Sequence, residues 1–408
     1  MNTNIGGLVK SKLSSFWLIV AGFMIWRAIL FLISVVADSF LPYDPSFPYS
    51  VDILAQYDLP RWIYSFANFD GVHYITIVEK GYVGTGLIQA FFPIYPLIVW
   101  AGTGLTLSPI VSGLIISGLF SLLAAYLFVK LAGLDLSSKS SLWSVSALAV
   151  FPTAFFLASM YSESLFITLV LGAFWAARSG KWLLAGIISA VASASRVVGI
   201  ALLPALILEL IIQTQVLSQL SNQRNLNKQL SVVFNWLKQH SSQLAFCLIG
   251  AVGILSFMTY LQLEFNDPLY FLHVQSEFGA GRSEKLVLYP QVVWRAIKIL
   301  FTYRPIDFKY WAFIQEAVVG IGGMTLLLAG FKRVRPSYWL FSFLAFLIPT
   351  LTGTFSSMPR YVLVCFPLFM WLGQLISKNQ TTRFFYLVIS GTLLIINTIL
   401  FVQGYWIA

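Results

Sequence analysis

Few residues in this chain could do acid–base chemistry, because only 10% of its 408 residues are charged and three are histidines. Asp70 and His73 lie three positions apart in the stretch Phe-Asp-Gly-Val-His-Tyr, and on a helix they would share one face. A carboxylate beside an imidazole suits general acid–base catalysis. The other interpretation is that Asp70 caps a helix and His73 is solvated.

A second candidate acid follows a long apolar run. Tyr161, Ser162 and Glu163 stand where we expect a span to leave the membrane. Ser162 could cap the next helix. Glu163 in the first turn of that helix would be stabilised by the helix dipole. Capping alone could therefore explain both residues.

Two arginines lie at the ends of other apolar runs. Arg196 follows Ala-Ser, and Arg360 stands between Pro359 and Tyr361. A guanidinium at the membrane edge suits a lipid phosphate, because its donors form a fixed fork. The alternatives are snorkelling to headgroups or pairing with an acid such as Glu163 or Asp70. Arg27, inside the first apolar run, has the same alternatives, and for it we favour a structural pair.

The stretch 264–275 mixes acids, aromatic residues and His273. Aromatic rings with polar groups suit sugar stacking and hydroxyl hydrogen bonds, and equally an interfacial belt. The sequence has no glycine-rich phosphate loop, no HExxH and no paired Cys-x-x-Cys. A divalent metal is possible, but no ligand motif supports one, and we expect no required cofactor. Cys247 and Cys365 lie in apolar runs and are expected to be buried thiols.

The composition sets the class of protein that must position these residues. The chain is 58% hydrophobic with a mean hydropathy of +0.82, whereas soluble domains carry about 25% charged residues. This excludes a soluble enzyme, a disordered chain and a disulfide-rich module. An all-α bundle that crosses the membrane many times remains. The formal charge of +10 then indicates basic cytoplasmic loops rather than a nucleic-acid partner.

A span needs about 20 apolar residues, and the pattern predicts about ten or eleven. The candidates are 15–37, 107–129, 142–160, 163–178, 182–195, 197–213, 242–263, 312–331, 337–352, 361–377 and 384–403. The run 182–213 is split at Arg196 because a central arginine is costly. The stretch 88–106 opens with two prolines and suits an interfacial or re-entrant piece. The first run lacks a cleavage site and is interpreted as a retained helix.

The charges predict the orientation. With the N-terminus in the cytoplasm, fourteen basic residues fall on that side, and thirteen of the fifteen acids fall on the other side or at its edge; the exceptions are Asp135 and Glu209. The basic residues are Lys10, Lys12, Lys130, Lys139, Arg178, Lys181, Arg224, Lys228, Lys238, Lys332, Arg333, Arg335, Lys378 and Arg383. We therefore predict one integral membrane domain over 1–408, with outer loops 38–106 and 264–311. The cytoplasmic loop 214–241 is expected to be a solvated linker with amphipathic pieces.

Acids and arginines from several spans are thus expected on one side of the membrane. An acid there could deprotonate an acceptor hydroxyl while arginines hold a lipid-linked phosphate, as glycosyl transfer from a polyprenyl phosphate sugar requires. The alternatives are a lipid or solute transporter or flippase, for which no convincing internal repeat is visible, and a non-catalytic membrane subunit.

The same residues carry a resemblance to a known family. Phe69–Tyr74, then Glu79-Lys80-Gly81-Tyr82 and Ala90–Leu97, resemble the signature of PIG-V-type mannosyltransferases. These are the GPI α-1,6-mannosyltransferases and their bacterial relatives. Thr153–Phe166 is a second match, and Ser195-Arg196 with Gly199, and Pro359-Arg360-Tyr361, are weaker ones. The matches run in order over about residues 60–370.

The resemblance implies a GT-C membrane bundle whose catalytic acid lies in the first outer loop. It implies inverting transfer of mannose, or a related hexose, from a polyprenyl or dolichyl phosphate to a glycolipid or other glycan. Asp70 would be the general base, helped by His73, and Glu163 would orient a sugar hydroxyl or pair with an arginine. Arg196, Arg360 and Tyr361 would bind the donor phosphate; Tyr74, Tyr161 and His273 would bind substrate. A bacterial relative would act in the plasma membrane with its site outside, and a eukaryotic one in the endoplasmic reticulum with a lumenal site.

Overall fold

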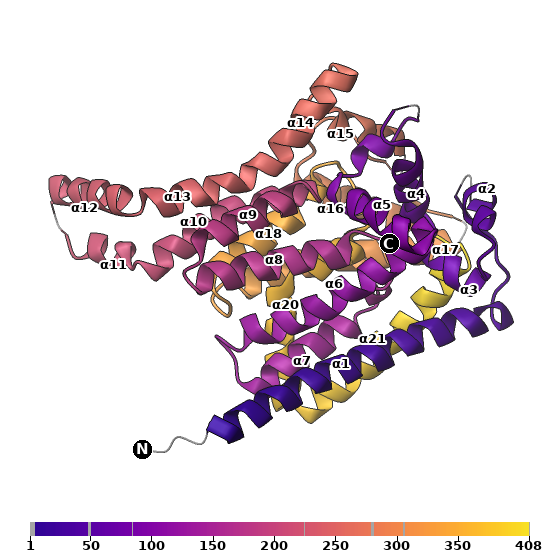
Figure 1. Ribbon diagram of the computed structural model, residues 1–408, viewed down its shortest axis with the longest axis horizontal. Coiled ribbons are helices and arrows are strands. Elements are labelled where there is room, and N and C mark those ends of the chain that lie inside the picture. The colour runs from indigo at the N-terminus through magenta and orange to yellow at the C-terminus, as the bar shows by residue number, and fades with distance from the viewer. Residues whose placement is uncertain are drawn as a thin grey trace. The chain divides into compact units, whose positions relative to one another are not determined.

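The computed structural model describes residues 5–47, 50–83, 85–223, 225–278, 281–304 and 307–407, with side chains from residue 16 onward except that of Phe278. Every regular element in those ranges is a helix (Figure 1), which confirms the predicted all-α class. The side chains of Lys10 and Lys12, and Arg224 as a whole, lie outside the described residues. The chain divides into two units, residues 1–79, 98–168 and 372–407, and residues 80–97 and 169–371, which we describe separately.

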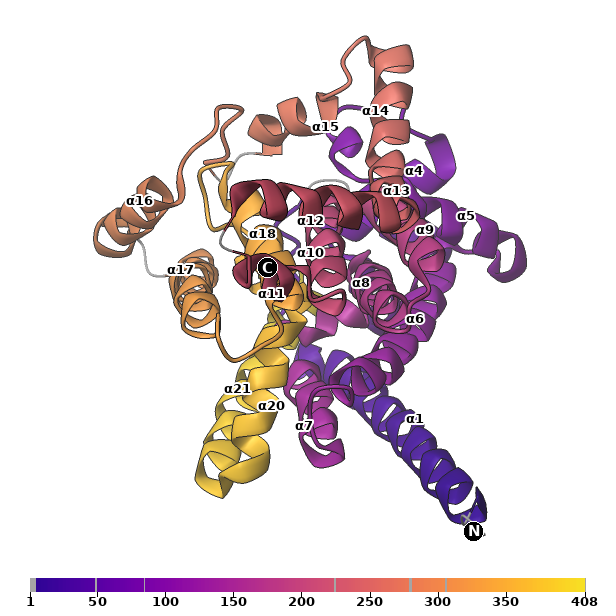
Figure 2. The ribbon, with the colours of Figure 1, turned by 90° about the vertical axis from the view of Figure 1, so that its left-hand side faces the viewer.

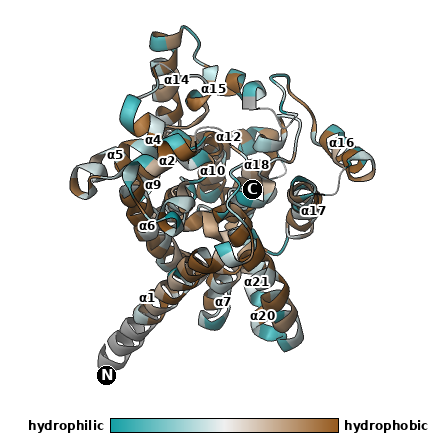
Figure 3. Cartoon of the chain, turned by 90° about the vertical axis from the view of Figure 1, so that its right-hand side faces the viewer, coloured by the Kyte–Doolittle hydropathy of each residue, from teal (hydrophilic) through white to brown (hydrophobic). Residues whose placement is uncertain are grey.

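Five helical segments are long and apolar enough to cross a membrane. They are Phe16–Ser39, Pro109–Ala132, Ser241–Phe265, Phe308–Ala329 and Gln380–Val402. A sixth candidate is the pair Met358–Val364 and Phe366–Lys378, which is bent by 79°. Hydrophobic residues cover most of these helices (Figure 3). The chain is therefore an integral, multi-pass membrane protein.

The predicted count of about ten or eleven spans is larger than helix length supports. Three of the expected spans form shorter apolar helices, Trp182–Ser193, Val197–Gln213 and Pro336–Thr350. A further short apolar helix is Ile94–Thr106. A helix of about 12 residues is about 18 Å long, and the hydrocarbon core is about 30 Å thick. The stretch 88–106, expected to be interfacial or re-entrant, contains one of these short helices.

The first unit is built around two long helices that pack together, α1 (Ile5–Val36) and α21 (Gln380–Val402), with α6 (Pro109–Ala132) against α1. Its shorter elements are η1 (Ala37–Ser39), α2 (Ser50–Leu54), η2 (Ala55–Tyr57), α3 (Arg61–Tyr64), η3 (Ser65–Ala67), α4 (Asp70–Lys80), α7 (Ser138–Ala149) and η5 (Ala154–Leu157). Four helices contribute residues to both units: α4, whose last residue Lys80 belongs to the second unit, α5 (Ile94–Thr106), α8 (Glu163–Arg178) and α20 (Phe366–Lys378).

The prediction of one span over 142–160 is wrong. Helix α7 ends at Ala149, and residues 150–162 are largely buried and mostly irregular. Pro152 explains the end, because proline lacks an N–H and disfavours helix in the residue before it. Neighbouring side chains satisfy the freed carbonyls. Trp26 donates to the Ala149 carbonyl at 2.8 Å and Ser390 to the Val150 carbonyl at 2.8 Å.

Arg27 also donates hydrogen bonds to backbone carbonyls, including one further along this irregular segment. Its guanidinium donates to the carbonyl of Ala158 and, at 3.2 Å, to that of Leu114. Ser117 donates to the Tyr161 carbonyl at 3.3 Å. A charged side chain inside a span is costly unless it is hydrogen-bonded. Arg27 therefore supports the backbone here through carbonyl groups, and the predicted structural pair stays a prediction.

The second unit holds the remaining helices. They are η4 (Ile88–Ala90), α9 (Trp182–Ser193), η6 (Val197–Ala201), α10 (Leu202–Gln213), α11 (Val216–Ser221), α12 (Leu226–Gln239), α13 (Ser241–Leu248), η7 (Ile249–Ala251), α14 (Val252–Phe265), α15 (Tyr270–His273), η8 (Val274–Phe278), α16 (Tyr289–Thr302), α17 (Phe308–Ala329), α18 (Pro336–Thr350), α19 (Met358–Tyr361) and η9 (Val362–Val364). Helix α10 packs against α18, and α17 against α18 and α19.

The predicted break at Arg196 is confirmed. Helix α9 ends at Ser193, Arg196 is extended, with φ −157° and ψ 144°, and η6 begins at Val197. The chain returns so closely that a Cβ on Gly199 would lie 2.5 Å from the carbonyl atoms of Ala192. Only glycine fits at that distance. Gly199, one of the motif residues, therefore permits the tight reversal that presents Arg196.

Small residues also join α9 to the broken helix α13–η7–α14. A Cβ on Gly253 would lie 1.8 Å from the Ala190 carbonyl oxygen. The Ser193 hydroxyl donates to the Gly250 carbonyl at 2.6 Å and accepts the Ile254 N–H at 3.2 Å. Close backbone approach with a polar side chain across it is a common way of joining membrane helices.

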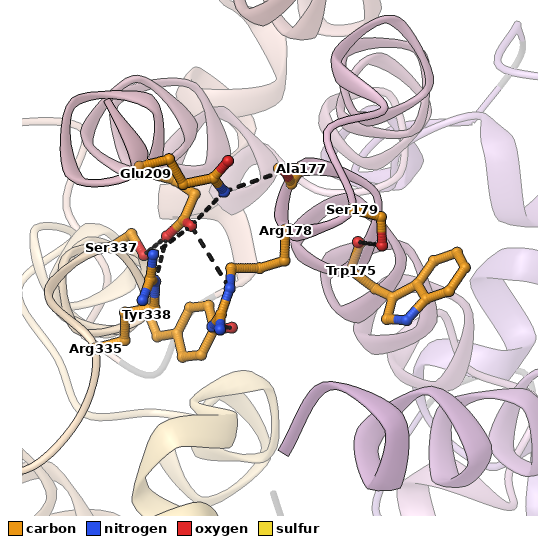
Figure 4. Close-up of polar contacts among 9 residues, drawn as sticks. Trp175, Ala177, Arg178, Ser179, Glu209, Arg335, Ser337 and Tyr338 are labelled. Atoms are coloured by element: carbon orange, nitrogen blue, oxygen red, sulfur yellow. Dashed lines mark hydrogen bonds and ion pairs between the residues drawn. The ribbon is translucent and has the colours of Figure 1, made fainter. Parts of the chain in front are cut away.

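A buried ion-pair network joins three helices of the second unit at Glu209, one of the two acids that the charge pattern left on the basic side (Figure 4). The Glu209 carboxylate accepts two hydrogen bonds from Arg335, at 2.7 and 2.8 Å, and one from Ser337 at 2.6 Å. Arg178 lies 3.8 Å away, and its guanidinium donates to the Tyr338 hydroxyl at 2.6 Å. Glu209 is thus an exception to the charge pattern because basic neighbours neutralise its carboxylate.

We expect Glu209→Ala to destabilise the protein strongly, because it leaves two partly buried arginines without the buried carboxylate that they share. Removing one partner of a buried pair costs about 3–5 kcal/mol. Thermal unfolding of the purified protein in detergent measures the effect. Lys332→Gln, which removes an exposed charge nearby, is the control, and equal midpoints for the two variants would contradict the prediction.

Candidate active site

Helix α4 begins at Asp70, directly after a sharp turn. Phe69 holds φ at +59°, in the left-handed region that bulky residues rarely occupy. The Gly71 N–H bonds the Asn68 carbonyl at 3.4 Å, and the Val72 N–H bonds the Phe69 carbonyl at 3.0 Å. Asp70 is partly exposed in the first turn of the helix. The turn therefore fixes the backbone from which the candidate base projects.

The Tyr161 hydroxyl bridges this turn from the other side. It donates to the Asn68 carbonyl at 2.8 Å and accepts the Asp70 N–H at 3.1 Å. Tyr161 is buried, and the Met160 N–H bonds the Phe66 carbonyl at 3.0 Å. The first two motifs of the resemblance thus meet in space, and Tyr161 contacts the backbone that carries Asp70.

Tyr74 and Ser162 form a second link between the same two segments. The Tyr74 hydroxyl donates to the Ser162 hydroxyl oxygen at 3.0 Å, and both residues are buried. The Ser162 carbonyl accepts the Phe166 N–H at 2.9 Å, the first backbone bond of α8. Glu163 begins this helix and is 1% exposed. Ser162 and Glu163 thus stand at the start of α8, and capping by the Ser162 hydroxyl stays a prediction.

Sequence reasoning missed Asn68, which is fully buried. Its side-chain amide donates to the Phe401 carbonyl at 2.8 Å and the Val402 carbonyl at 3.4 Å, at the end of α21. The Phe69 ring packs 5.3 Å from the ring of Trp406. An asparagine just before a helix start is a capping signal, and that signal pointed to this position. Nothing in the sequence indicated that the partners of its side chain lie near residue 401.

His73 follows Asp70 by one helical turn and is partly exposed. Burial lowers the pKa of His73 from its ordinary value of 6.5, and the negative charge of Asp70 opposes that shift in part. The imidazole is therefore neutral at pH 7. A neutral imidazole can accept or donate one proton beside the carboxylate.

The remaining part of the first motif belongs to the second unit and is an aromatic cluster. The Tyr82 hydroxyl donates to the Phe91 carbonyl at 2.7 Å, and the Phe92 ring packs 4.8 Å from the ring of Phe257. The Ile94 N–H bonds the Ala194 carbonyl at 3.3 Å. This cluster therefore supports the turn that presents Arg196.

Arg196, Arg360 and Tyr361 come together in the second unit, as the phosphate-site hypothesis requires. The guanidinium carbon of Arg196 lies 5.1 Å from the centroid of the Tyr361 ring, and that of Arg360 lies 5.6 Å from it. Both distances are within cation–π range. One aromatic ring therefore holds two guanidinium groups that are 164 positions apart in sequence.

Sequence reasoning also missed Glu316, a buried acid within the span α17. Its carboxylate accepts the Ser357 N–H at 3.0 Å. Ser357 holds φ at +66° and directly precedes α19, which carries Arg360. A lone acid in an apolar helix is a signal for a specific role. Glu316 therefore fixes the backbone before Arg360.

His273 lies on α15, exposed, with Nδ1 2.6 Å from Oδ2 of Asp267. Its role in substrate binding stays a prediction. No group of three or more His, Cys, Asp or Glu residues that could hold a metal ion occurs within the described ranges. The expectation that no metal is required also stays a prediction.

The geometry thus defines two sets of residues. The first unit joins Asp70 and His73 to Tyr74, Tyr161 and the start of α8 at Glu163. The second unit joins Arg196, Arg360 and Tyr361. A sequence model described as mannosyltransferase (PIG-V) matches residues 18–313, which is most of the chain. The chain belongs to the PIG-V mannosyltransferase family. Arg360 and Tyr361 fall outside the matched residues, so their assignment rests on the Tyr361 ring, which contacts both Arg196 and Arg360.

Among solved structures, the chain is similar to the archaeal oligosaccharyltransferase AglB from Archaeoglobus fulgidus, in complex with an inhibitory peptide and a dolichol-phosphate. The TM-score is 0.43 and the sequence identity is 13%. The match covers 95% of this chain, which spans 56% of the AglB chain. A comparison with proteins of curated function finds no match. The family assignment therefore rests on the sequence match.

The lowered pKa of His73 predicts a pH dependence of stability. A histidine whose folded pKa is below its unfolded value stabilises the fold above the unfolded pKa, and this is lost as pH falls through the folded pKa. We expect stability to fall more steeply below about pH 6.5 in the parent protein than in His73→Gln. Thermal unfolding at pH 5–8 measures the difference, and parallel curves would contradict the prediction.

Proposed function

We propose that this PIG-V family member transfers mannose from a polyprenyl or dolichyl phosphate to a hydroxyl of a membrane glycolipid or glycan. The observation that carries the proposal is the fixed turn at Asn68–Asp70, which presents a partly exposed carboxylate between two buried tyrosine links. Family membership supports the mannosyl chemistry, and the paired arginines support a phosphate-linked donor.

Asp70 is the proposed general base. Its carboxylate takes the proton of the acceptor hydroxyl as that oxygen attacks the anomeric carbon. The bond from this carbon to the phosphate oxygen breaks on the opposite face, so the configuration inverts. Neutral His73, one turn along α4, is proposed to hold the carboxylate or the acceptor hydroxyl in line.

Arg196 and Arg360 are proposed to hold the donor phosphate. Negative charge grows on the phosphate oxygens as the sugar leaves, and fixed guanidinium donors stabilise that charge. The Tyr361 ring orients both groups through the two cation–π contacts. Glu163 is proposed to orient a sugar hydroxyl or one of these arginines, and His273 to contact a substrate sugar.

The two tyrosines of the first unit are proposed to position the base. Both were predicted to bind substrate, but the Tyr161 hydroxyl bonds the backbone of residues 68–70 and the Tyr74 hydroxyl bonds Ser162. The charge pattern supports a site on the outer side of a plasma membrane, or on the lumenal side of the endoplasmic reticulum in a eukaryotic cell.

Asp70→Asn tests the proposed base, because the amide keeps the size of the side chain but cannot take the proton. We expect transfer of radiolabelled mannose from polyprenyl phosphate mannose to a total lipid extract to fall by about 10²–10⁴-fold. Donor binding should be retained. Arg360→Lys is the contrasting variant, and it should weaken donor binding instead. Equal transfer by Asp70→Asn and the parent protein would remove Asp70 from the mechanism.

Tyr161→Phe tests the positioning role. The substitution keeps the ring and removes the acceptor of the Asp70 N–H, and an unsatisfied buried donor costs about 1–3 kcal/mol. We expect kcat to fall about tenfold with KM for the donor unchanged, since 1.4 kcal/mol is a factor of about ten in rate. Tyr386→Phe, which removes a hydroxyl that donates to the Ala147 carbonyl at 2.7 Å elsewhere in the first unit, is the matched control. An increase in KM with unchanged kcat would instead indicate that Tyr161 binds substrate.

A further inference from the structure

Helix α12 (Leu226–Gln239) carries an apolar face that nothing in its own unit covers. The exposed apolar residues are Leu226, Leu230, Val233, Phe234 and Leu237, and their spacing places them on one side of the helix. Phe234 is 68% exposed. The sequence predicted a solvated linker with amphipathic pieces, and α12 is such an amphipathic piece. A fully solvated helix would not gather five large apolar side chains on one face.

The contacts of α12 with the protein lie on other sides of the helix. Val232 and Trp236 are partly buried, and the Trp236 indole donates to the Thr214 hydroxyl at 2.9 Å, just after α10. Helix α11 packs against α12. The apolar face therefore points away from the elements that fix the helix.

The charge of α12 and its connection to a candidate span indicate what covers its apolar face. No Asp or Glu occurs between Glu209 and Glu264, whereas Lys228 and Lys238 lie on α12 itself. Directly after His240 the candidate span Ser241–Phe265 begins, so one end of α12 lies at a membrane boundary. Figures 1 and 2 show α12 adjoining the end of α13.

We propose that α12 lies in the membrane interface, with its apolar face in the acyl–headgroup boundary and its lysines on anionic lipid headgroups. A helix with a strong apolar face, a basic polar face and low overall hydrophobicity binds membranes in this way. Basic residues beside a span add attraction to anionic lipids. A second copy of the chain, or a soluble partner, would leave the face outside the lipid.

The test uses the full-length protein in nanodiscs that hold one copy each. An environment-sensitive fluorophore is attached at Phe234→Cys, and in the matched control at Asn235→Cys. Asn235 is exposed and one residue further on, which is about 100° round the helix. The native Cys247 and Cys365 are buried and should react slowly. The quenchers are brominated phosphatidylcholine in the bilayer and iodide in the water.

We expect brominated lipid to quench the Phe234→Cys probe at least twofold more than the Asn235→Cys probe, and iodide to show the reverse order. Replacing one third of the phosphatidylcholine with brominated phosphatidylglycerol should increase quenching at the first probe, and Lys228→Gln with Lys238→Gln should remove that increase. Strong iodide quenching at both positions would overturn the proposal, since the face would be in water. A probe shielded from both quenchers would overturn it in favour of a protein contact.

Discussion

The hydroxyl of Tyr161 is the interaction on which the candidate site depends. It accepts the Asp70 N–H, which as the first N–H of α4 has no partner within the helix, and it adds a second donor to the Asn68 carbonyl. The tyrosine is itself held in an irregular segment whose carbonyls receive hydrogen bonds from spans α1 and α6. Backbone polar groups inside a membrane protein must be satisfied internally. The position of the Asp70 backbone therefore depends on side chains of the long helices.

The second unit presents its arginines by the same means, namely by interrupting helices. The chain breaks before Arg196, where Gly199 lets η6 return against α9, and again at Ser357, where Glu316 binds the freed N–H. Each break places a guanidinium at the end of an apolar helix rather than in its middle, where charge is most costly. The buried Glu209 network shows the other solution, in which the charges neutralise one another within the protein.

The parts of this arrangement that are local in sequence could be predicted from it. The break at Arg196 followed from the cost of a central arginine, and the start of α4 from the Phe-Asp-Gly-Val-His-Tyr stretch. The span over 142–160 was wrong because hydropathy was given more weight than Pro152. The partners of its carbonyls come from α1 and α21, more than 100 residues away, so no local pattern could indicate them. The partners of Asn68 and Glu316 also lie in distant segments, although each of these two residues carried a local signal of its own.

The strain at Phe69 explains why so many contacts meet at one turn. A bulky residue with φ at +59° costs about 1–3 kcal/mol, and such a conformation persists only where its surroundings determine it. The ring of Phe69 packs between those of Phe47, at 4.5 Å, and Trp406, at 5.3 Å, while Asn68 is bonded to the end of α21. Without these contacts the backbone at Phe69 would relax. The first turn of α4 would then shift, and the Asp70 side chain would point in another direction. The strained turn thus links the end of the last long helix to the orientation of the proposed base.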